Sequence, residues 1–111
     1  MYVPVDLTNL REMTDGDKDV EMMLFEEFFK SAHSCLSGLE QFCHSPENDQ
    51  WRRNAHAFKG IALNIGAAQL STLCKQAQDG MALPSPQKQT LLDSIKTEYG
   101  LVQNYLKTMI G

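Results

Sequence analysis

The stretch NAHAFKGIALNIG, residues 54–66, decides the fold that this chain can adopt. Read as a helix, it places His56 and Lys59 on one face, because side chains three or four residues apart are neighbours on a helix. Gly60 lies beside His56 and costs the helix about 1 kcal/mol relative to alanine. The opposite face is apolar and consists of Phe58, Ile61, Ala62 and Ile65. The stretch therefore predicts an amphipathic helix with an exposed histidine next to a position without a side chain.

Breaks in the apolar pattern divide the rest of the chain into further helices, and proline, glycine and capping residues mark these breaks. No window alternates in the manner of a strand, so the expected fold class is all-α. Short connections favour antiparallel neighbours. We therefore expect an up-down-up-down four-helix bundle with a short extra N-terminal helix, in a single domain of residues 1–111. The expected helices span about residues 6–13, 18–43, 47–66, 67–80 and 85–109.

The expected core consists of the apolar residues that recur at helical spacing. In the segment 18–43, this stripe begins with Val20 and Leu24 and continues through Phe28. Ser85 is the expected N-cap of the last helix. That helix has the clearest stripe, which consists of Leu92, Ile95, Tyr99, Val102, Leu106 and Met109.

The composition is that of an ordinary globular protein, with 42% hydrophobic and 22% charged residues. A net charge of −4 argues against nucleic acid as the main partner, because clustered lysine and arginine bind phosphate backbones. No apolar run reaches the roughly 18 residues that cross a bilayer, and the N-terminus has no secretory signal pattern. We therefore expect a cytoplasmic protein that binds neither nucleic acid nor membrane. The cysteines lack Cys-x-x-Cys spacing and should be buried, reduced thiols, namely Cys35, Cys43 and Cys74.

The surroundings of His56 suggest a chemistry. A neutral imidazole nitrogen is a nucleophile, and nearby cations neutralise an anionic group that it receives. Phosphoryl is the natural candidate, because its transfer needs little from a protein beyond positioning and charge. The plain alternative is a solvated surface histidine beside an ordinary lysine. At about 100° per residue, four side chains fall within about 60° of His56, namely Arg52, Arg53, Lys59 and Leu63.

The spacing in this stretch resembles that of the histidine-containing phosphotransfer (HPt) domains of multistep phosphorelays. Their pattern is His-x-x-Lys-Gly-x-Ala/Ser-x-x-Leu/Ile-Gly on an exposed helix of a four-helix bundle, and the likeness extends over essentially the whole chain. Ile61 and Leu63 depart from it, since many relatives have smaller residues there. The matching residues here are His56, Lys59, Gly60, Ala62, Ile65 and Gly66.

The resemblance implies that His56 accepts a phosphoryl group from a receiver-domain aspartyl phosphate and passes it reversibly to another receiver domain. Lys59 would support the phosphoryl group electrostatically, and Gln78 on the following helix would hydrogen-bond near the ring. The chain has no Gly-rich phosphate loop, so we expect a phosphoryl carrier and not an autonomous kinase. It would need no cofactor or metal of its own, because the partner receiver domain supplies Mg²⁺.

The partners implied by the resemblance are receiver domains and a hybrid histidine kinase, and the protein itself is expected to be a monomer. Gly60 would leave room for the incoming receiver domain, and Leu63 would give that domain an apolar contact. Arg52 and Arg53 complete the expected partner-binding surface.

Two other functions fit parts of the pattern. A helical adaptor could dock a receiver or kinase through the same face without phosphorylation. A kinase dimerisation domain is less favoured, because there the histidine precedes an acidic residue and here Ala57 follows it. His33 and His44 are expected to be solvated, and Met1 with a capped first helix favours a free-standing protein over a piece of a hybrid kinase.

Overall fold

The computed structural model describes residues 1–110, which contain five helices and no strand. The predicted all-α fold class is therefore confirmed. Each expected helix is present, with its ends within about two residues of the expected ones. The helices are α1 (Thr8–Thr14), α2 (Lys18–Phe42), α3 (Asn48–Ile65), α4 (Ala68–Asp79) and α5 (Ser85–Ile110).

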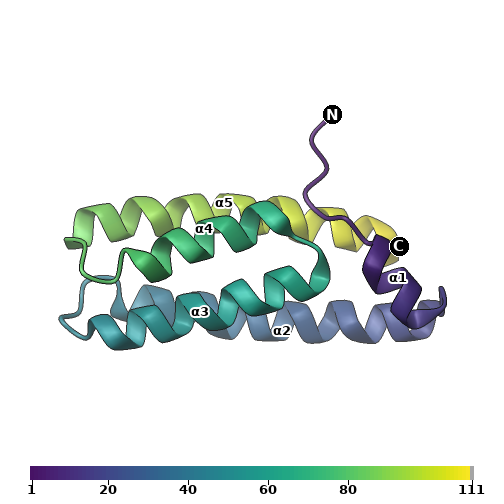
Figure 1. Ribbon diagram of the computed structural model, residues 1–111, viewed down its shortest axis with the longest axis horizontal. Helices are drawn as coiled ribbons and strands as arrows, with labels where there is room; N and C mark the ends of the chain where they lie inside the picture. Colours follow the sequence, from purple (N-terminus) through teal and green to yellow (C-terminus); the bar gives the residue numbers. More distant parts are fainter. Residues whose placement is uncertain (111) are drawn as a thin grey trace.

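The four longer helices lie side by side along the 44 Å length of the molecule, and successive helices run in opposite directions (Figure 1). Helix α2 packs against α3 and α5, and α4 packs against the other sides of α3 and α5. The short helix α1 packs on the N-terminal end of α2, where α3 and α4 do not reach (Figure 1).

Local signals account for several helix ends. The carboxylate of Asp17 accepts hydrogen bonds from two backbone N–H groups in the first turn of α2. Gly66 ends α3 in the left-handed region with φ of 88°, which glycine adopts without strain. Ser85 is not the N-cap of α5 as expected, because the first-turn N–H groups donate to the carbonyl of Pro84, one residue earlier.

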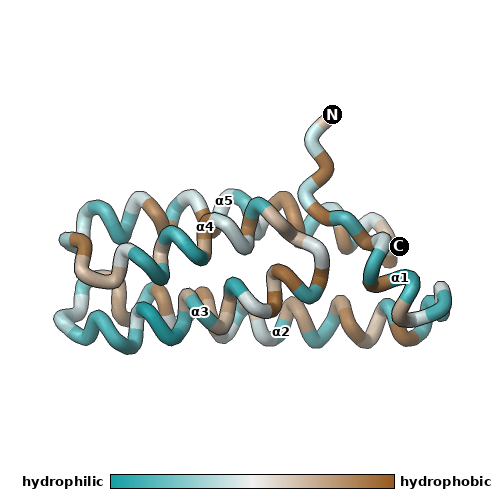
Figure 2. Tube along the Cα trace, viewed as in Figure 1, coloured by the Kyte–Doolittle hydropathy of each residue, from teal (hydrophilic) through white to brown (hydrophobic). Residues whose placement is uncertain are grey.

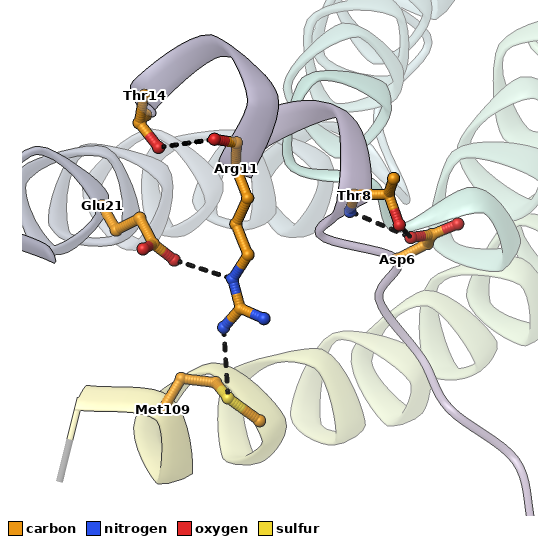
Figure 3. A network of polar contacts seen from close by, with 6 residues as sticks. All are labelled: Asp6, Thr8, Arg11, Thr14, Glu21 and Met109. Carbon is orange, nitrogen blue, oxygen red and sulfur yellow. Dashed lines mark hydrogen bonds and ion pairs between the residues drawn. The ribbon is translucent and has the colours of Figure 1, made fainter. Parts of the chain in front are cut away.

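The chain before α1 forms a strap that crosses the turn between α3 and α4. Val5 and Leu7 are buried, and the N–H of Asp6 donates to the carbonyl of Gly66 at 2.9 Å. The Asp6 carboxylate accepts from the hydroxyl and the backbone N–H of Thr8 (Figure 3). These hydrogen bonds lower the pKa of Asp6 and hold the residues just before α1, whose N-cap residue is Leu7.

Arg11 ties α1 to the ends of two other helices (Figure 3). Its Nε atom lies 3.2 Å from a carboxylate oxygen of Glu21 on α2, and a second nitrogen lies 3.9 Å from the sulfur of Met109 on α5. Glu21 is only 8% exposed, so this partner keeps a buried carboxylate from being left unpaired.

The observed core is shifted along α2 from the expected one. Phe28 is buried as expected, and Phe25 is buried with it. Val20 and Leu24, however, are each 38% exposed, because the first turns of α2 extend beyond the end of α3 (Figure 1). In α5, Tyr99 is only partly buried and Met109 is exposed, while the rest of the stripe is buried. The three cysteines are buried free thiols, as expected, and burial raises the pKa of each.

A close contact fixes α2 against α3. A Cβ atom on Gly38 would lie 2.0 Å from the side-chain oxygen of Asn54, so Asn54 occupies the space that any side chain would need. The amide of Asn54 also donates to the carbonyl of Gln50 at 2.8 Å. Asn54 therefore sets the distance and register between the two helices, two residues before His56.

Candidate functional site

Helix α3 holds His56 outward because the other side of the helix is locked into the core. Ala55, Phe58 and Ala62 are fully buried, whereas His56 is exposed. The Phe58 ring packs edge-on against Tyr99 with centroids 6.0 Å apart. Figure 2 shows that the first half of α3 is mostly hydrophilic and that the hydrophobic segments of this helix gather in its second half. In the sequence, His56 lies at the middle of α3.

Gln78, in the last turn of α4, lies against the ring of His56. Its side-chain oxygen is 3.3 Å from the Nδ1 atom of His56. An amide oxygen can only accept a hydrogen bond, so this contact is a hydrogen bond when the proton is on Nδ1. The Nε2 atom then carries the lone pair, on the side of the ring away from Gln78. In this tautomer Nε2 is the ring nitrogen that could act as a nucleophile.

The cations near His56 differ from the expected cluster. Arg52 and Arg53 both pair with Asp49, at 3.2 and 3.1 Å, on the exposed surface of the first turns of α3. The spacing of three and four residues was a signal for these pairs that the sequence interpretation did not use. Lys59 is partly buried and makes no ion pair within residues 1–110. Among the described residues, Lys59 is therefore the cation near His56 that has no carboxylate partner.

C-terminal to His56 on α3, the exposed face has no side chain at Gly60 and an apolar side chain at Leu63. A Cβ atom added to Gly60 would meet no atom within 4 Å, and Leu63 is 59% exposed. Next to this face, a groove of about 370 Å³ lies between α1, α2 and α3. Its apolar lining consists of Leu10, Met13, Leu24, Phe28, Ile61 and Ile65. The groove was not predicted from the sequence, because its shape depends on where α1 packs.

The remaining candidates lie away from this face. His33 and His44 are exposed, and the Nε2 atom of His44 is 3.0 Å from the side-chain oxygen of Gln89. In the part of the chain that the structure describes, no three His, Cys, Asp or Glu side chains gather as a metal site requires. None of the helices in that part has the length and apolarity to cross a membrane.

Comparisons with known proteins agree with the fold and with the family resemblance. The family model of the Hpt domain matches residues 23–109. The chain is also similar to a solved structure, the histidine-containing phosphotransfer protein B (HptB) of Pseudomonas aeruginosa PAO1. The two structures superpose with a TM-score of 0.84 at 22% sequence identity, over 99% of this chain and 96% of that one. At this identity, the similarity shows a shared fold and nothing more. No curated protein matches the sequence.

Proposed function

Because this chain belongs to the Hpt domain family, we propose that it is a phosphorelay intermediate that carries a phosphoryl group on His56. It accepts the group from the aspartyl phosphate of one receiver domain and passes it reversibly to another. The four long helices are then the antiparallel up-down-up-down bundle that presents this histidine. The observation that carries the proposal is the contact of 3.3 Å between His56 and Gln78, because it leaves Nε2 as an exposed nucleophile.

The transfer can be written with all atoms and charges in place. The lone pair of Nε2 attacks phosphorus in line, an N–P bond forms, and the bond from phosphorus to the aspartyl oxygen breaks. The electron pair of the broken bond stays on the aspartate, which leaves as a carboxylate. The Nδ1 proton does not move, and the ring becomes positively charged. The side-chain oxygen of Gln78 then accepts a hydrogen bond from a cationic ring, which is a stronger bond than one from a neutral ring.

Lys59 supplies the charge that the transferred group needs from this chain. Its ammonium lies one helical turn from His56 and is not engaged with a carboxylate in residues 1–110. It can therefore interact with the phosphoryl oxygens. We propose that Mg²⁺ comes with the receiver domain and that this chain acts as a carrier without kinase activity.

The surface around His56 suits a receiver domain as the partner. Gly60 leaves open space at the closest approach to the ring, and exposed Leu63 offers an apolar contact two turns from His56. The apolar groove beside them extends this contact surface to α1 and α2. Arg52 and Arg53 lie on the other side of His56 and remain exposed enough to contact an acidic partner surface.

A phosphotransfer assay tests the proposal. Receiver domains from the host are phosphorylated, mixed with the protein, and the label is followed on this chain. We expect an acid-labile label on the wild type and on the control His33→Gln, and none on His56→Gln. Stable binding of a receiver domain without any label would instead favour the adaptor function. Labelling of His56→Gln equal to that of the wild type would refute His56 as the acceptor.

A further inference from the structure

Trp51 lies where three helices meet, five residues before His56 on α3. Its side chain is fully buried, and its indole N–H donates to the carbonyl of Ala77 on α4 at 2.8 Å. Lys88 on α5 places its ammonium 5.4 Å from the centre of the indole ring. Trp51, on α3, therefore contacts both α4 and α5.

The carbonyl that Trp51 binds is in the last turn of α4, which ends at Asp79. The last carbonyls of a helix have no N–H partner further along that helix. The indole supplies the missing donor for Ala77, and it does so inside the protein, where an unpaired carbonyl would be costly. Gln78 is the next residue, so the hydrogen bond from Trp51 fixes the peptide group from which the Gln78 side chain extends.

Lys88, on α5, also contacts the indole ring of Trp51. Lys88 is only 2% exposed, and its ammonium donates to the side-chain oxygen of Asn48 at 2.7 Å. No carboxylate lies within ion-pair distance of Lys88 in the described chain. The face of the indole is therefore part of the environment that stabilises this buried cation. The ring cannot turn away from Ala77 without removing that interaction.

We propose that Trp51 is a positioning residue for the phosphoryl site. Through the carbonyl of Ala77 it places the Gln78 amide against His56, and so determines which ring nitrogen of His56 carries the proton. The significance of this tautomer rests on the proposed function, because only the Nδ1–H form offers Nε2 to phosphorus. The tautomer itself can be measured without any phosphoryl transfer.

A replacement that removes only the hydrogen-bond donor gives the sharpest test. The chain has one tryptophan, so incorporation of β-(3-benzothienyl)alanine changes Trp51 alone. This analogue has nearly the same shape, with sulfur in place of the indole N–H. Trp51→Phe is the genetic counterpart. Phe25→Leu is the control, because Phe25 is buried at the other end of the bundle, near Met109.

Nitrogen-15 NMR of the His56 ring, at a pH well above the ordinary titration range of imidazole, reports the two tautomers. We expect the wild type and Phe25→Leu to hold the Nδ1–H form. Both replacements of Trp51 should lower the population of this form to that of Gln78→Ala. In the Gln78→Ala background, replacement of Trp51 should change nothing further. A folded Trp51 variant with the wild-type tautomer ratio, or an equal effect in the Gln78→Ala background, would overturn the inference.

Phosphorylation of the protein by phosphoramidate supplies a second measurement. The rate for the Trp51 variants should fall by the same factor as the Nδ1–H population, because only that form is competent. An unchanged rate in a variant whose tautomer has shifted would contradict the inferred consequence for reactivity. A wild type that no phosphoryl donor modifies would contradict the proposed function instead, and the NMR comparison would still decide the role of Trp51.

Discussion

Gly60 is the position at which stability and partner docking should respond in opposite directions. A Cβ atom there meets no atom within 4 Å, and Gly60 lies in the interior of α3 without a positive φ. Replacement by alanine should therefore stabilise the protein by about 0.8–1.0 kcal/mol, the difference in helix propensity between the two residues. With an unfolding entropy of about 2.1 cal/mol/K per residue, this corresponds to a rise in Tm of about 4 °C.

Gly100 provides a matched control. It lies in the interior of α5, and a Cβ atom added there also meets no atom within 4 Å. Gly100→Ala should raise Tm by the same amount as Gly60→Ala. The two positions should differ with the larger replacement, leucine. We expect Gly60→Leu to weaken the binding of a receiver domain at least about 10-fold, or about 1.4 kcal/mol, and Gly100→Leu to leave it unchanged.

Thermal unfolding and titration calorimetry with the receiver domain measure the two effects. A lower Tm for Gly60→Ala, with a normal rise for Gly100→Ala, would refute the inference that open space surrounds Gly60. Wild-type affinity in Gly60→Leu would refute its role in clearance for the partner. Weaker binding of Gly60→Leu and Gly100→Leu alike would show that the loss does not depend on the face around His56.

Three further predictions concern single interactions. Lys59→Ala should slow phosphoryl transfer about fivefold, because an ammonium near a phosphoryl group at the surface contributes about 1 kcal/mol, and the circular dichroism spectrum should not change. Asn48→Ala should lower the free energy of unfolding in urea by about 1.5–3 kcal/mol, because the buried ammonium of Lys88 loses its hydrogen-bond acceptor. Burial and the hydrogen bond to Glu98 raise the pKa of Tyr2 to about 12, so its contribution to stability should be complete below pH 10 and vanish as the pH rises to about 12. Carbon-13 NMR of the phenol ring should show this pKa, and Glu98→Gln should lower it.

Each of these predictions has a control elsewhere in the chain. Lys75→Ala removes an exposed lysine that pairs with Asp79, and should leave transfer unchanged. Asn104→Ala removes an exposed amide, and should change the free energy of unfolding by less than about 0.5 kcal/mol. Glu40→Gln, the control for Glu98→Gln, removes a carboxylate that pairs with Lys96 and should leave the pKa of Tyr2 unchanged. Equal effects of a substitution and its control would count against the assigned interaction.

The helices and the direction of their apolar faces could be predicted from periodicity, but not what covers each face. Val20 and Leu24 have the right spacing for the core, yet each is 38% exposed, and Leu24 lines the open groove between α1, α2 and α3. The exposure of these two residues depends on the lengths of the neighbouring helices and on the position of α1. The spacing of apolar residues along α2 predicts neither. Lys88 shows the reverse case. A lysine is normally solvated, and its burial depends on Asn48 and Trp51, which belong to another helix.

The candidate site was more accessible to prediction than the core. Its main residues lie on one helix, so the spacing of His56 and Lys59 already placed them on one exposed face. The family resemblance added Gln78, and the structure brings it to His56, although the roles of these residues stay predictions. Arg52 pairs with Asp49, one turn earlier on α3, so its positive charge is partly neutralised by a neighbour on the same helix.

The contact between Gly38 and Asn54 has an evolutionary consequence. Any side chain at Gly38 would displace the Asn54 amide, which is 2.0 Å from the added Cβ atom. In a lineage that exchanges the glycine, the asparagine should be replaced in the same period, and neither change should persist alone. The two positions, 16 residues apart in the sequence, should be inherited as one trait, and their covariation among homologues would mark the proteins that share this spacing of α2 and α3.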